Sequence, residues 1–176
     1  MRIETERLII TEMTMDMAPD VHENSLDEDT RRFVPDEVFE TLEDAQETVD
    51  FIISQYCSKK GPLIYALITK EANNNIGYVQ LVPIDEGKWE IGYHVAKAFT
   101  GKGFAKEAVK TFLPAIVDYV GATEVYGLCL LENAASCRVL EKCGFETFFT
   151  GEAPYQGRVR KICKSVWKKS RIIEAK

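Results

Sequence analysis

The fold of this chain is decided by the stretch Glu90-Ile-Gly-Tyr-His-Val95, which is followed closely by Phe99-Thr-Gly-Lys-Gly-Phe-Ala105. Together they indicate a strand, a glycine-rich turn and the start of a long helix with an apolar face. The first N–H groups of such a helix have no partner within it and point to one place, where they can bind phosphate. Gly101 and Gly103 suit this turn because a side chain would hinder an approaching anion, and because glycine accepts positive φ.

The helix that starts after Gly103 is predicted to end at Gly121. Its apolar residues recur at positions i, i+3, i+4 and i+7, which indicates a buried face. These residues are Val109, Phe112, Leu113, Ile116, Val117 and Val120. Pro114 should bend the helix, because it cannot donate to the carbonyl of Lys110. A strand over residues 124–131 follows, so strand, helix and strand form a parallel, right-handed crossover.

Three strands with short turns between them precede the glycine-rich turn, and they predict an antiparallel meander. They cover residues 63–69, 76–83 and 89–95. Upstream we predict a strand at residues 8–10, a helix at 16–26 and a loop at 31–40. Thr41 and Asp44 have the spacing of a helix cap, and the helix they begin is predicted to end at Gly61-Pro62.

Beyond the crossover, the chain adds a helix and a hairpin to the sheet. The helix is predicted over residues 133–143, and the hairpin strands over 145–149 and 158–167. The result is a mixed sheet flanked by helices, an α/β or α+β fold in a single domain over residues 1–176. A length of 176 residues suits one domain with a sizeable core.

Composition excludes several classes of function. Hydrophobic residues make up 45% of the chain and charged residues 28%, as in ordinary globular proteins. No apolar run approaches the roughly 20 residues needed to span a bilayer, and the N-terminus lacks a secretory signal, so we expect a cytoplasmic protein without a membrane partner. Five cysteines without a C-x-x-C pair argue against a disulfide framework and a zinc site, and we expect no metal.

Charge is distributed unevenly along the chain. The net charge of −6 argues against nucleic acid as a partner. Residues 1–60 hold 16 acidic and 6 basic residues, whereas residues 61–176 hold 12 and 16. Two interpretations stay open. The charges can simply form two solvated faces, or the acidic third can attract a cationic substrate while the rest holds an anionic cofactor.

Four passages in order resemble the GNAT N-acetyltransferase superfamily, and within it the branch of ribosomal-protein N-terminal alanine and serine acetyltransferases. They are Glu4-Thr-Glu-Arg-Leu8, Glu90-Ile-Gly-Tyr93, Thr100-Gly-Lys-Gly-Phe-Ala105, and Asn133-Ala-Ala-Ser136 with Gly144-Phe145. The resemblance spans nearly the whole chain. It implies a mixed, mostly antiparallel central sheet whose fourth and fifth strands, 89–95 and 124–131 here, splay apart and hold acetyl-CoA between them.

The resemblance also assigns cofactor contacts. The pantetheine arm would pair with the backbone near Tyr93, His94 and Val95. The pyrophosphate would lie on the N–H groups of Gly101, Lys102, Gly103, Phe104, Ala105 and Lys106. The family usually has Arg or Gln where this chain has Thr100, so we expect weaker CoA binding there, offset in part by Lys102 or Lys106.

Acetyl transfer to an amine needs a base for the amine proton, a donor for the oxyanion and a donor for the departing thiolate. Glu90 is our candidate base, with Gly92 keeping its face of the strand open for a substrate, and His94 is a rival. The N–H groups of His94 and Val95 are the expected oxyanion donors, which would require a β-bulge there.

The helix start at Asn133 supplies the remaining candidates. Asn133 suits a helix cap, and the resemblance adds a contact to the CoA arm. Ser136 is our candidate donor to the thiolate. Many relatives carry a tyrosine seven residues after the Asn, where this chain has Leu140, so Tyr93, Tyr126 or water would have to act instead.

We therefore predict an acetyl-CoA-dependent N-acetyltransferase that acts as a monomer or homodimer. The acceptor is a primary amine, namely a peptide N-terminus, a polyamine or another small amine, bound between Asp16 and Tyr56. An α-amine is the easier substrate, because its pKa of about 7.7–8.0 lies well below that of lysine. The alternative is a CoA-binding sensor or interaction module that has lost turnover. A nucleotide-binding domain fits poorly, because the glycine turn lacks the Gly-Lys-Ser/Thr ending.

Overall fold

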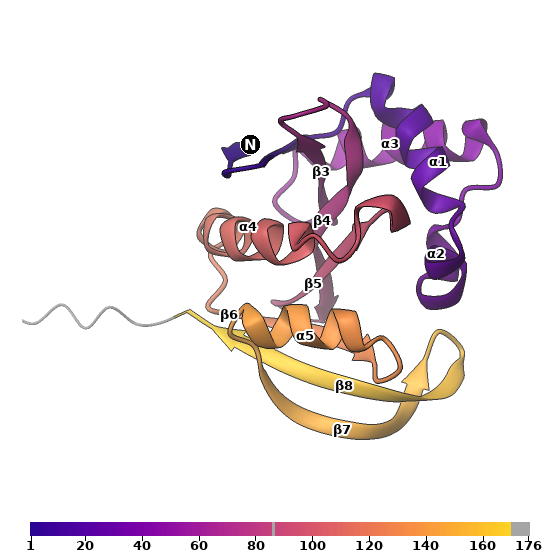
Figure 1. The fold of residues 1–176 in the computed structure, drawn as a ribbon. Helices are drawn as coiled ribbons and strands as arrows, with labels where there is room; N and C mark the ends of the chain where they lie inside the picture. The colour runs from indigo at the N-terminus through magenta and orange to yellow at the C-terminus, as the bar shows by residue number, and fades with distance from the viewer. Residues whose placement is uncertain (86, 170–176) are drawn as a thin grey trace, which may run out of the picture.

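The computed structural model describes residues 1–85 and 87–169, which form a single eight-stranded sheet with helices on both faces (Figure 1). The strand order is β1-β2-β3-β4-β5-β6-β8-β7. The strands are β1 (Arg2–Glu4), β2 (Leu8–Glu12), β3 (Leu63–Thr69), β4 (Asn75–Asp85), β5 (Lys88–Val95), β6 (Glu124–Leu130), β7 (Glu146–Tyr155) and β8 (Arg158–Lys168). The α-helices are α1 (Ala18–Ser25), α2 (Glu28–Phe33), α3 (Leu42–Gln55), α4 (Phe104–Val120) and α5 (Ala134–Lys142).

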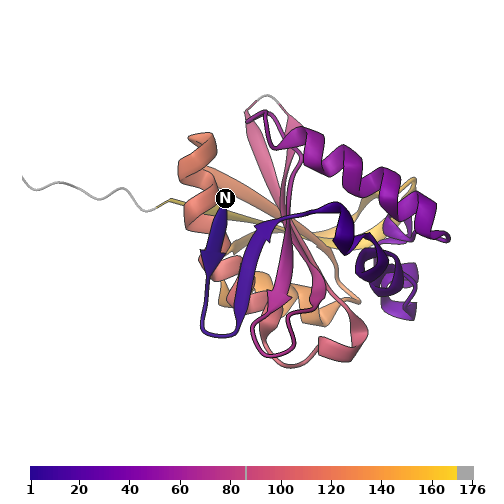
Figure 2. The same cartoon turned by 90° about the horizontal axis from the view of Figure 1, so that it is seen from above.

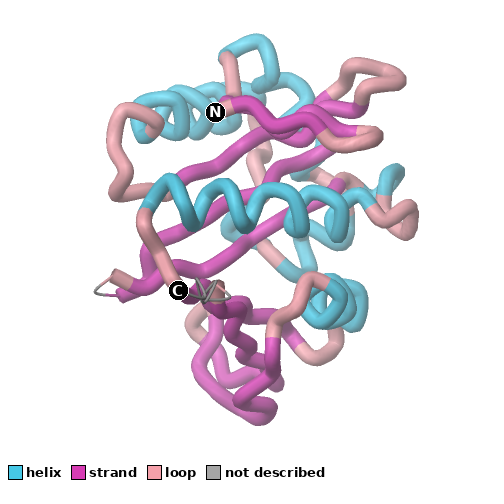
Figure 3. The backbone as a smooth tube through the Cα atoms, turned by 90° about the vertical axis from the view of Figure 1, so that its left-hand side faces the viewer, coloured by secondary structure: helices cyan, strands magenta, loops and turns pink. Residues whose placement is uncertain are grey.

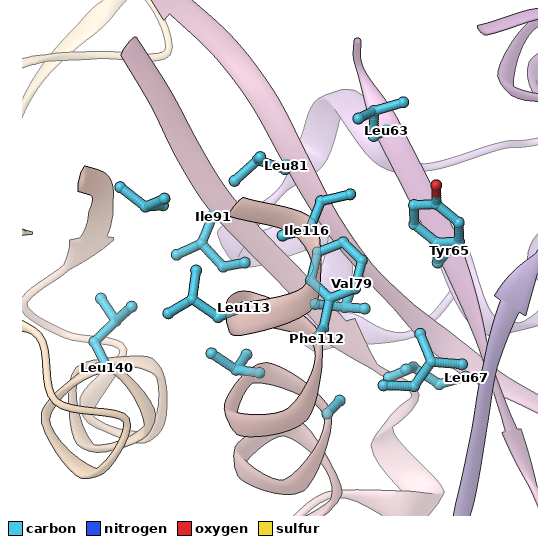
Figure 4. Close-up of a cluster of buried hydrophobic side chains, with 14 of the residues drawn as sticks. Leu63, Tyr65, Leu67, Val79, Leu81, Ile91, Phe112, Leu113, Ile116 and Leu140 are labelled. Carbon is cyan, nitrogen blue, oxygen red and sulfur yellow. The ribbon is translucent and has the colours of Figure 1, made fainter. Parts of the chain in front are cut away.

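The sheet separates two hydrophobic layers. Helices α4 and α5 lie on one face and α1 to α3 on the other (Figure 2). On the first face, Phe112, Leu113 and Ile116 of α4 pack on side chains of the central strands (Figure 4). On the second face, Val49 and Ile52 of α3 pack with smaller apolar residues of α1 and β3. Among the described residues, no helix is both long and apolar enough to cross a membrane.

Most predicted elements are confirmed. Strand β3 has its predicted bounds, and β3, β4 and β5 form the expected antiparallel meander. Helix α4 runs from its cap at Gly103 to Gly121, and it continues through Pro114. Thr41 and Asp44 form a complete capping box at the start of α3.

Two elements were missed, and the end of one helix was predicted wrongly. Strand β1 was missed because Ile3 is its only apolar residue, and α2 was missed because it falls partly in the predicted loop. Helix α3 ends at Gln55, ahead of the predicted end at Gly61-Pro62. The next residue, Tyr56, has a hydroxyl that accepts from the N–H of Met13 and donates to the carbonyl oxygen of Ile64.

The C-terminal hairpin is longer than predicted. Strands β7 and β8 extend to a two-residue turn at Gln156 and Gly157, both of which have positive φ. That conformation suits the twist of a tight hairpin. The hairpin lies at the opposite end of the molecule from the N-terminal strands (Figure 3).

The predicted separation of two neighbouring strands is confirmed in β5 and β6. These strands are parallel, and they pair at one position, Glu90 with Tyr126. By contrast, β5 pairs with β4 and β6 pairs with β8 along nearly their full lengths. The sheet therefore opens between β5 and β6 on the side of Val95.

Candidate active site

A cleft of about 200 Å³ occupies the opening between β5 and β6. Its walls come from both strands, from α5 on one face of the sheet, and from the segment after α2 and the β7–β8 turn on the other. Of the predicted site residues, Glu90, Tyr93, Asn133 and Ser136 line it. Five segments that lie apart in the sequence thus meet in one cavity.

The edge of β5 that faces this opening carries unpaired backbone groups. The N–H of Ala96 donates to the carbonyl oxygen of Ile76 in β4, at 2.8 Å. Because N–H directions alternate along a strand, the N–H groups of Tyr93 and Val95 point to the other side, toward β6. The N–H of His94 points to β4. The β4–β5 ladder keeps its register from Val95 to Trp89, so the β-bulge that we expected near His94 is wrong.

The glycine-rich turn has the expected conformation. Gly101 and Gly103 have φ values of 75° and 83°, and Gly103 caps α4 without a side-chain hydrogen bond to the helix. The first N–H groups of α4 are therefore free of a capping side chain. Thr100 donates its hydroxyl to the carbonyl oxygen of Lys97 at 2.9 Å, and the Lys102 ammonium lies 5.3 Å from the centre of the Phe99 ring.

Arg7, which the sequence analysis did not single out, braces this turn from the N-terminal hairpin. Its guanidinium donates to the carbonyl oxygen of Lys102 at 2.9 Å and to the Glu107 carboxylate at 2.7 Å, and lies over the Phe104 ring. Although burial acts to raise the pKa of Glu107, hydrogen bonds from Thr5 and Arg7 hold that pKa below its usual value. An ionised Glu107 and Arg7 thus fix the turn without using its free N–H groups.

Glu90 is held in an environment suited to a base. Burial raises the pKa of its carboxyl, and the charge of Lys164 on β8 acts in the opposite direction. A carboxylate with a raised pKa is a better proton acceptor at neutral pH than a fully solvated one. Its place at the single β5–β6 pair puts it where the two strands begin to diverge.

Tyr93 and Ser136 meet across the cleft. The Tyr93 hydroxyl lies 2.9 Å from the carbonyl oxygen of Ser136 and 3.0 Å from the Ser136 hydroxyl. Asn133 caps α5 by accepting from the Ser136 N–H at 3.0 Å, as predicted for a cap. Leu140 packs over Gly127, where a Cβ would lie 2.8 Å from its side chain. Tyr126, by contrast, donates to Glu124, at 2.6 Å.

The His94 side chain belongs to a different environment from that of Glu90. Its Nε2 lies 2.8 Å from the Thr30 hydroxyl, and its ring stacks on Tyr78. Burial lowers the pKa of His94, against the charges of Asp27 and Asp29. The imidazole lines a second cavity beside the cleft, so it is placed less well than Glu90 to act in the cleft.

Sequence reasoning missed two further groups in the cleft, Glu37 and Tyr155. Glu37 lies after α2, and burial together with Asp36 raises the pKa of its carboxyl to about 7, although Gln80 acts to lower it. Gly92 makes room for Gln80 itself, since a Cβ would lie 2.5 Å from the Gln80 amide nitrogen. The only sequence signal for Glu37 was the acidic N-terminal third.

Comparison with known proteins agrees with this geometry. Residues 7–146 match the family model described as "Acetyltransferase (GNAT) domain". A curated relative, the uncharacterized N-acetyltransferase YnaD of Bacillus subtilis (strain 168), is 28% identical over 152 residues, which are 85% of this chain and 86% of that protein.

Solved structures share the fold. A GNAT-family acetyltransferase from Bacillus anthracis superimposes with a TM-score of 0.82 at 24% identity, covering 96% of this chain and 98% of that one. RimL, a ribosomal L7/L12 α-N-protein acetyltransferase in complex with coenzyme A, gives 0.81 at 16% identity with the same coverage.

The fold and the family match define the class of this protein as an acyltransferase. The chain belongs to the GNAT family of N-acetyltransferases.

Proposed function

We propose that this protein transfers an acetyl group from acetyl-CoA to a primary amine by direct attack, with both substrates bound at once. The observation that carries the proposal is the opening between β5 and β6, together with the start of α4, which no side chain caps. The N–H of Tyr93 suits pairing with the pantetheine arm, that of Val95 suits the thioester oxygen beside it, and those of Gly101 to Lys106 suit the pyrophosphate. His94 would then contribute through its position in β5 rather than through its N–H.

The residues in the cleft support one order of proton movements. Glu90 accepts the proton that the amine loses as its nitrogen attacks the acetyl carbonyl carbon. The N–H of Val95 donates to the oxygen that becomes negative. The carbon–sulfur bond then breaks, and the hydroxyl of Ser136, which Tyr93 holds, donates its proton to the thiolate that leaves. Ser136 regains a proton from solvent, and Glu90 releases to solvent the proton that it took from the amine. Holding amine and thioester side by side supplies much of the rate.

The acceptor classes that we consider are a peptide N-terminus, a polyamine and another small amine. RimL is a ribosomal L7/L12 α-N-protein acetyltransferase, and this favours an α-amine as the first class to test. A CoA-binding sensor without turnover is the second candidate, because Thr100 and Leu140 depart from the family pattern. A monomer or homodimer in the cytoplasm stays our prediction.

Thiol release measured over a panel of amines tests the proposal. We expect acetyl-CoA to raise the Tm of the protein and NAD and ATP to leave it unchanged. With at least one amine, free CoA should then be released from acetyl-CoA. The mass of that amine should rise by about 42 Da, because an acetyl group replaces one amine hydrogen. Acetyl-CoA binding without any acetylated amine would favour the sensor, and no binding would overturn both candidates.

A further inference from the structure

A second cavity of about 230 Å³ lies next to the cleft, on the face of the sheet that α1 and α3 cover. The apolar part of its wall comes from α1, α3, β3, β4 and two connecting segments: Val21, Ile52, Ile64, Tyr78, Met13 and Phe39. Polar side chains, among them Glu37, Asn75 and His94, complete the wall. An apolar cavity of about 150 Å³ is large enough to bind benzene. The second cavity therefore has room for a branched aliphatic or aromatic side chain.

The two cavities meet at Glu37. Asp36, Glu37, Tyr78 and Gln80 line both of them, so these residues form the boundary between the two cavities. Glu90 lines the cleft but not the second cavity. A ligand whose polar end lies at Glu37 thus has the candidate base on one side and an apolar space on the other.

Two buried polar atoms in the wall of the second cavity lack a partner within residues 1–85 and 87–169. They are Oε2 of Glu37 and the amide nitrogen of Asn75, which lines the second cavity. Asn75 is only 4% exposed, and its amide oxygen already accepts from the N–H of Gly77. A buried carboxylate oxygen needs a donor, and a buried amide N–H needs an acceptor.

We infer that the acceptor is an α-amine next to a carbonyl and a bulky apolar side chain, as at a peptide N-terminus that begins with such a residue. The side chain fills the second cavity, the amine donates to Glu37, and the carbonyl oxygen accepts from Asn75. This inference rests on the proposed acetyl transfer and narrows its acceptor class.

The electrostatics of the site support this choice over a polyamine. The Glu37 carboxyl is buried and has no ion-pair partner among residues 1–85 and 87–169, and an acceptor ammonium would supply the missing positive charge. Farther into the second cavity, the lining is apolar apart from amide, hydroxyl and imidazole groups, and burial lowers the pKa of His94 there. Apart from Asp36 and Glu37, the residues that line the cavity offer no carboxylate to a polyamine's second cation. Asp27 and Asp29, which lie behind the lining, already bond to Lys97.

A panel of amino-acid amides tests the inference, because its members share the α-amine and the carbonyl and differ only in the side chain. With acetyl-CoA, we expect kcat/KM for leucinamide and phenylalaninamide to exceed that for glycinamide by about tenfold or more. Equal values for the three amides, or a higher value for spermidine, would overturn the inference while leaving acetyl transfer intact. Calorimetric binding of the same amides to the CoA-bound protein gives the same ranking without turnover, so it decides the inference even if acetylation fails.

Two pairs of variants locate the effect. Thr48 lines the second cavity from α3, and Thr48→Phe should lower kcat/KM for leucinamide far more than for glycinamide, so that the preference is lost. Gln46→Phe places the same side chain at an exposed position of that helix outside either cavity and should keep the preference. Retention of the preference in Thr48→Phe, with an unchanged Tm, would place the side chain elsewhere.

The second pair concerns the amine. Glu37→Gln keeps the shape of the side chain but removes its charge, and should raise KM for every amide by about tenfold with little change in KM for acetyl-CoA. Glu40→Gln is the control, since Glu40 is exposed and pairs with Arg31. Equal effects of both variants on KM would assign the attraction to overall charge instead of to Glu37.

Discussion

The hydroxyl of Tyr93 lies 3.0 Å from the hydroxyl of Ser136, so a side chain of β5 spans the cleft to the first turn of α5. Burial raises the pKa of Tyr93, and its hydroxyl therefore stays protonated over the neutral range. Many relatives have a tyrosine where this chain has Leu140, so Leu140 supplies no hydroxyl to the cleft. The hydrogen-bonded pair of Tyr93 and Ser136 supplies hydroxyl groups to the same cleft instead.

If this pair acts as one unit on the departing thiolate, its two variants will not be additive. Tyr93→Phe and Ser136→Ala should each lower kcat by about 100-fold, and the double variant should be no worse than the poorer single one. Steady-state kinetics at saturating acetyl-CoA measures this. Effects that multiply would show that the two hydroxyls act independently, and unchanged kcat values would assign the thiolate's proton to water.

Glu90→Gln should lower kcat/KM by about 100-fold or more without affecting acetyl-CoA binding. Because a base works only when deprotonated, wild-type activity should fall as the pH falls through the pKa of Glu90, which lies above its usual value. The variant should lack this part of the pH–rate profile. Glu124→Gln, which alters a carboxylate bonded to Tyr126 outside the cleft, is the matched control. If the two variants behave alike, Glu90 is not the base.

Thr100→Arg should strengthen CoA binding at the glycine-rich turn. The exposed threonine hydroxyl bonds to Lys97 and brings no charge, whereas an arginine can pair with a phosphate. Exposed ion pairs are weak, so we expect the Kd for CoA to fall by at most about fivefold, and the gain to vanish in high salt. Titration calorimetry at two salt concentrations measures this, with Ala98→Arg as a nearby control. A gain of the same size in the control would point to net charge alone.

Glu37→Gln should make the protein more stable at alkaline pH. The pKa of Glu37 is about 7 in the folded protein and near 4.5 in the unfolded chain. The folded state therefore holds an extra proton between these values, and stability falls as the pH rises from about 4.5 to about 7. At pH 8 the charged carboxylate costs about 3 kcal/mol, which the variant avoids.

Urea unfolding of both proteins at pH 4 and pH 8 measures the difference. The two should have similar stability at pH 4, where the carboxyl is protonated in either state, and the variant should be the more stable at pH 8. A constant difference at both values would indicate a packing effect in place of titration.

The sequence was informative where one segment determines its own structure. The periodic apolar face of α4 and the glycines on either side of it predict both of its ends, and the Thr41–Asp44 spacing predicts the start of α3. Segments without such signals were missed. Helix α2 is too short and polar for a periodic face, although Asp27 caps it, and Pro154 in β7 resembled a turn residue although an edge strand tolerates it.

The separation of β5 from β6 was expected only from the family resemblance. No local pattern encodes how far two strands diverge when a helix of 17 residues lies between them. Glu37 shows the same limit, since its carboxyl interacts with Gln80, and Gln80 has its place because Gly92 lacks a side chain. The segments that carry Glu37, Gln80 and Gly92 must come together in the fold before the pKa of the Glu37 carboxyl is raised.

The hydrogen bond from Arg7 to the carbonyl oxygen of Lys102 affects how this protein should be produced for binding measurements. Arg7, near the beginning of the chain, holds the turn proposed to receive the pyrophosphate. In the same hairpin, the Met1 ammonium pairs with Glu12 at the end of the neighbouring strand β2. A purification tag fused ahead of Met1 would remove that ammonium and its ion pair with Glu12, and would add chain next to the hairpin that carries Arg7. Affinity measurements on an amino-terminal fusion would then describe a loosened turn, so recombinant material for CoA titrations is best tagged at the other terminus or cleaved to a free methionine.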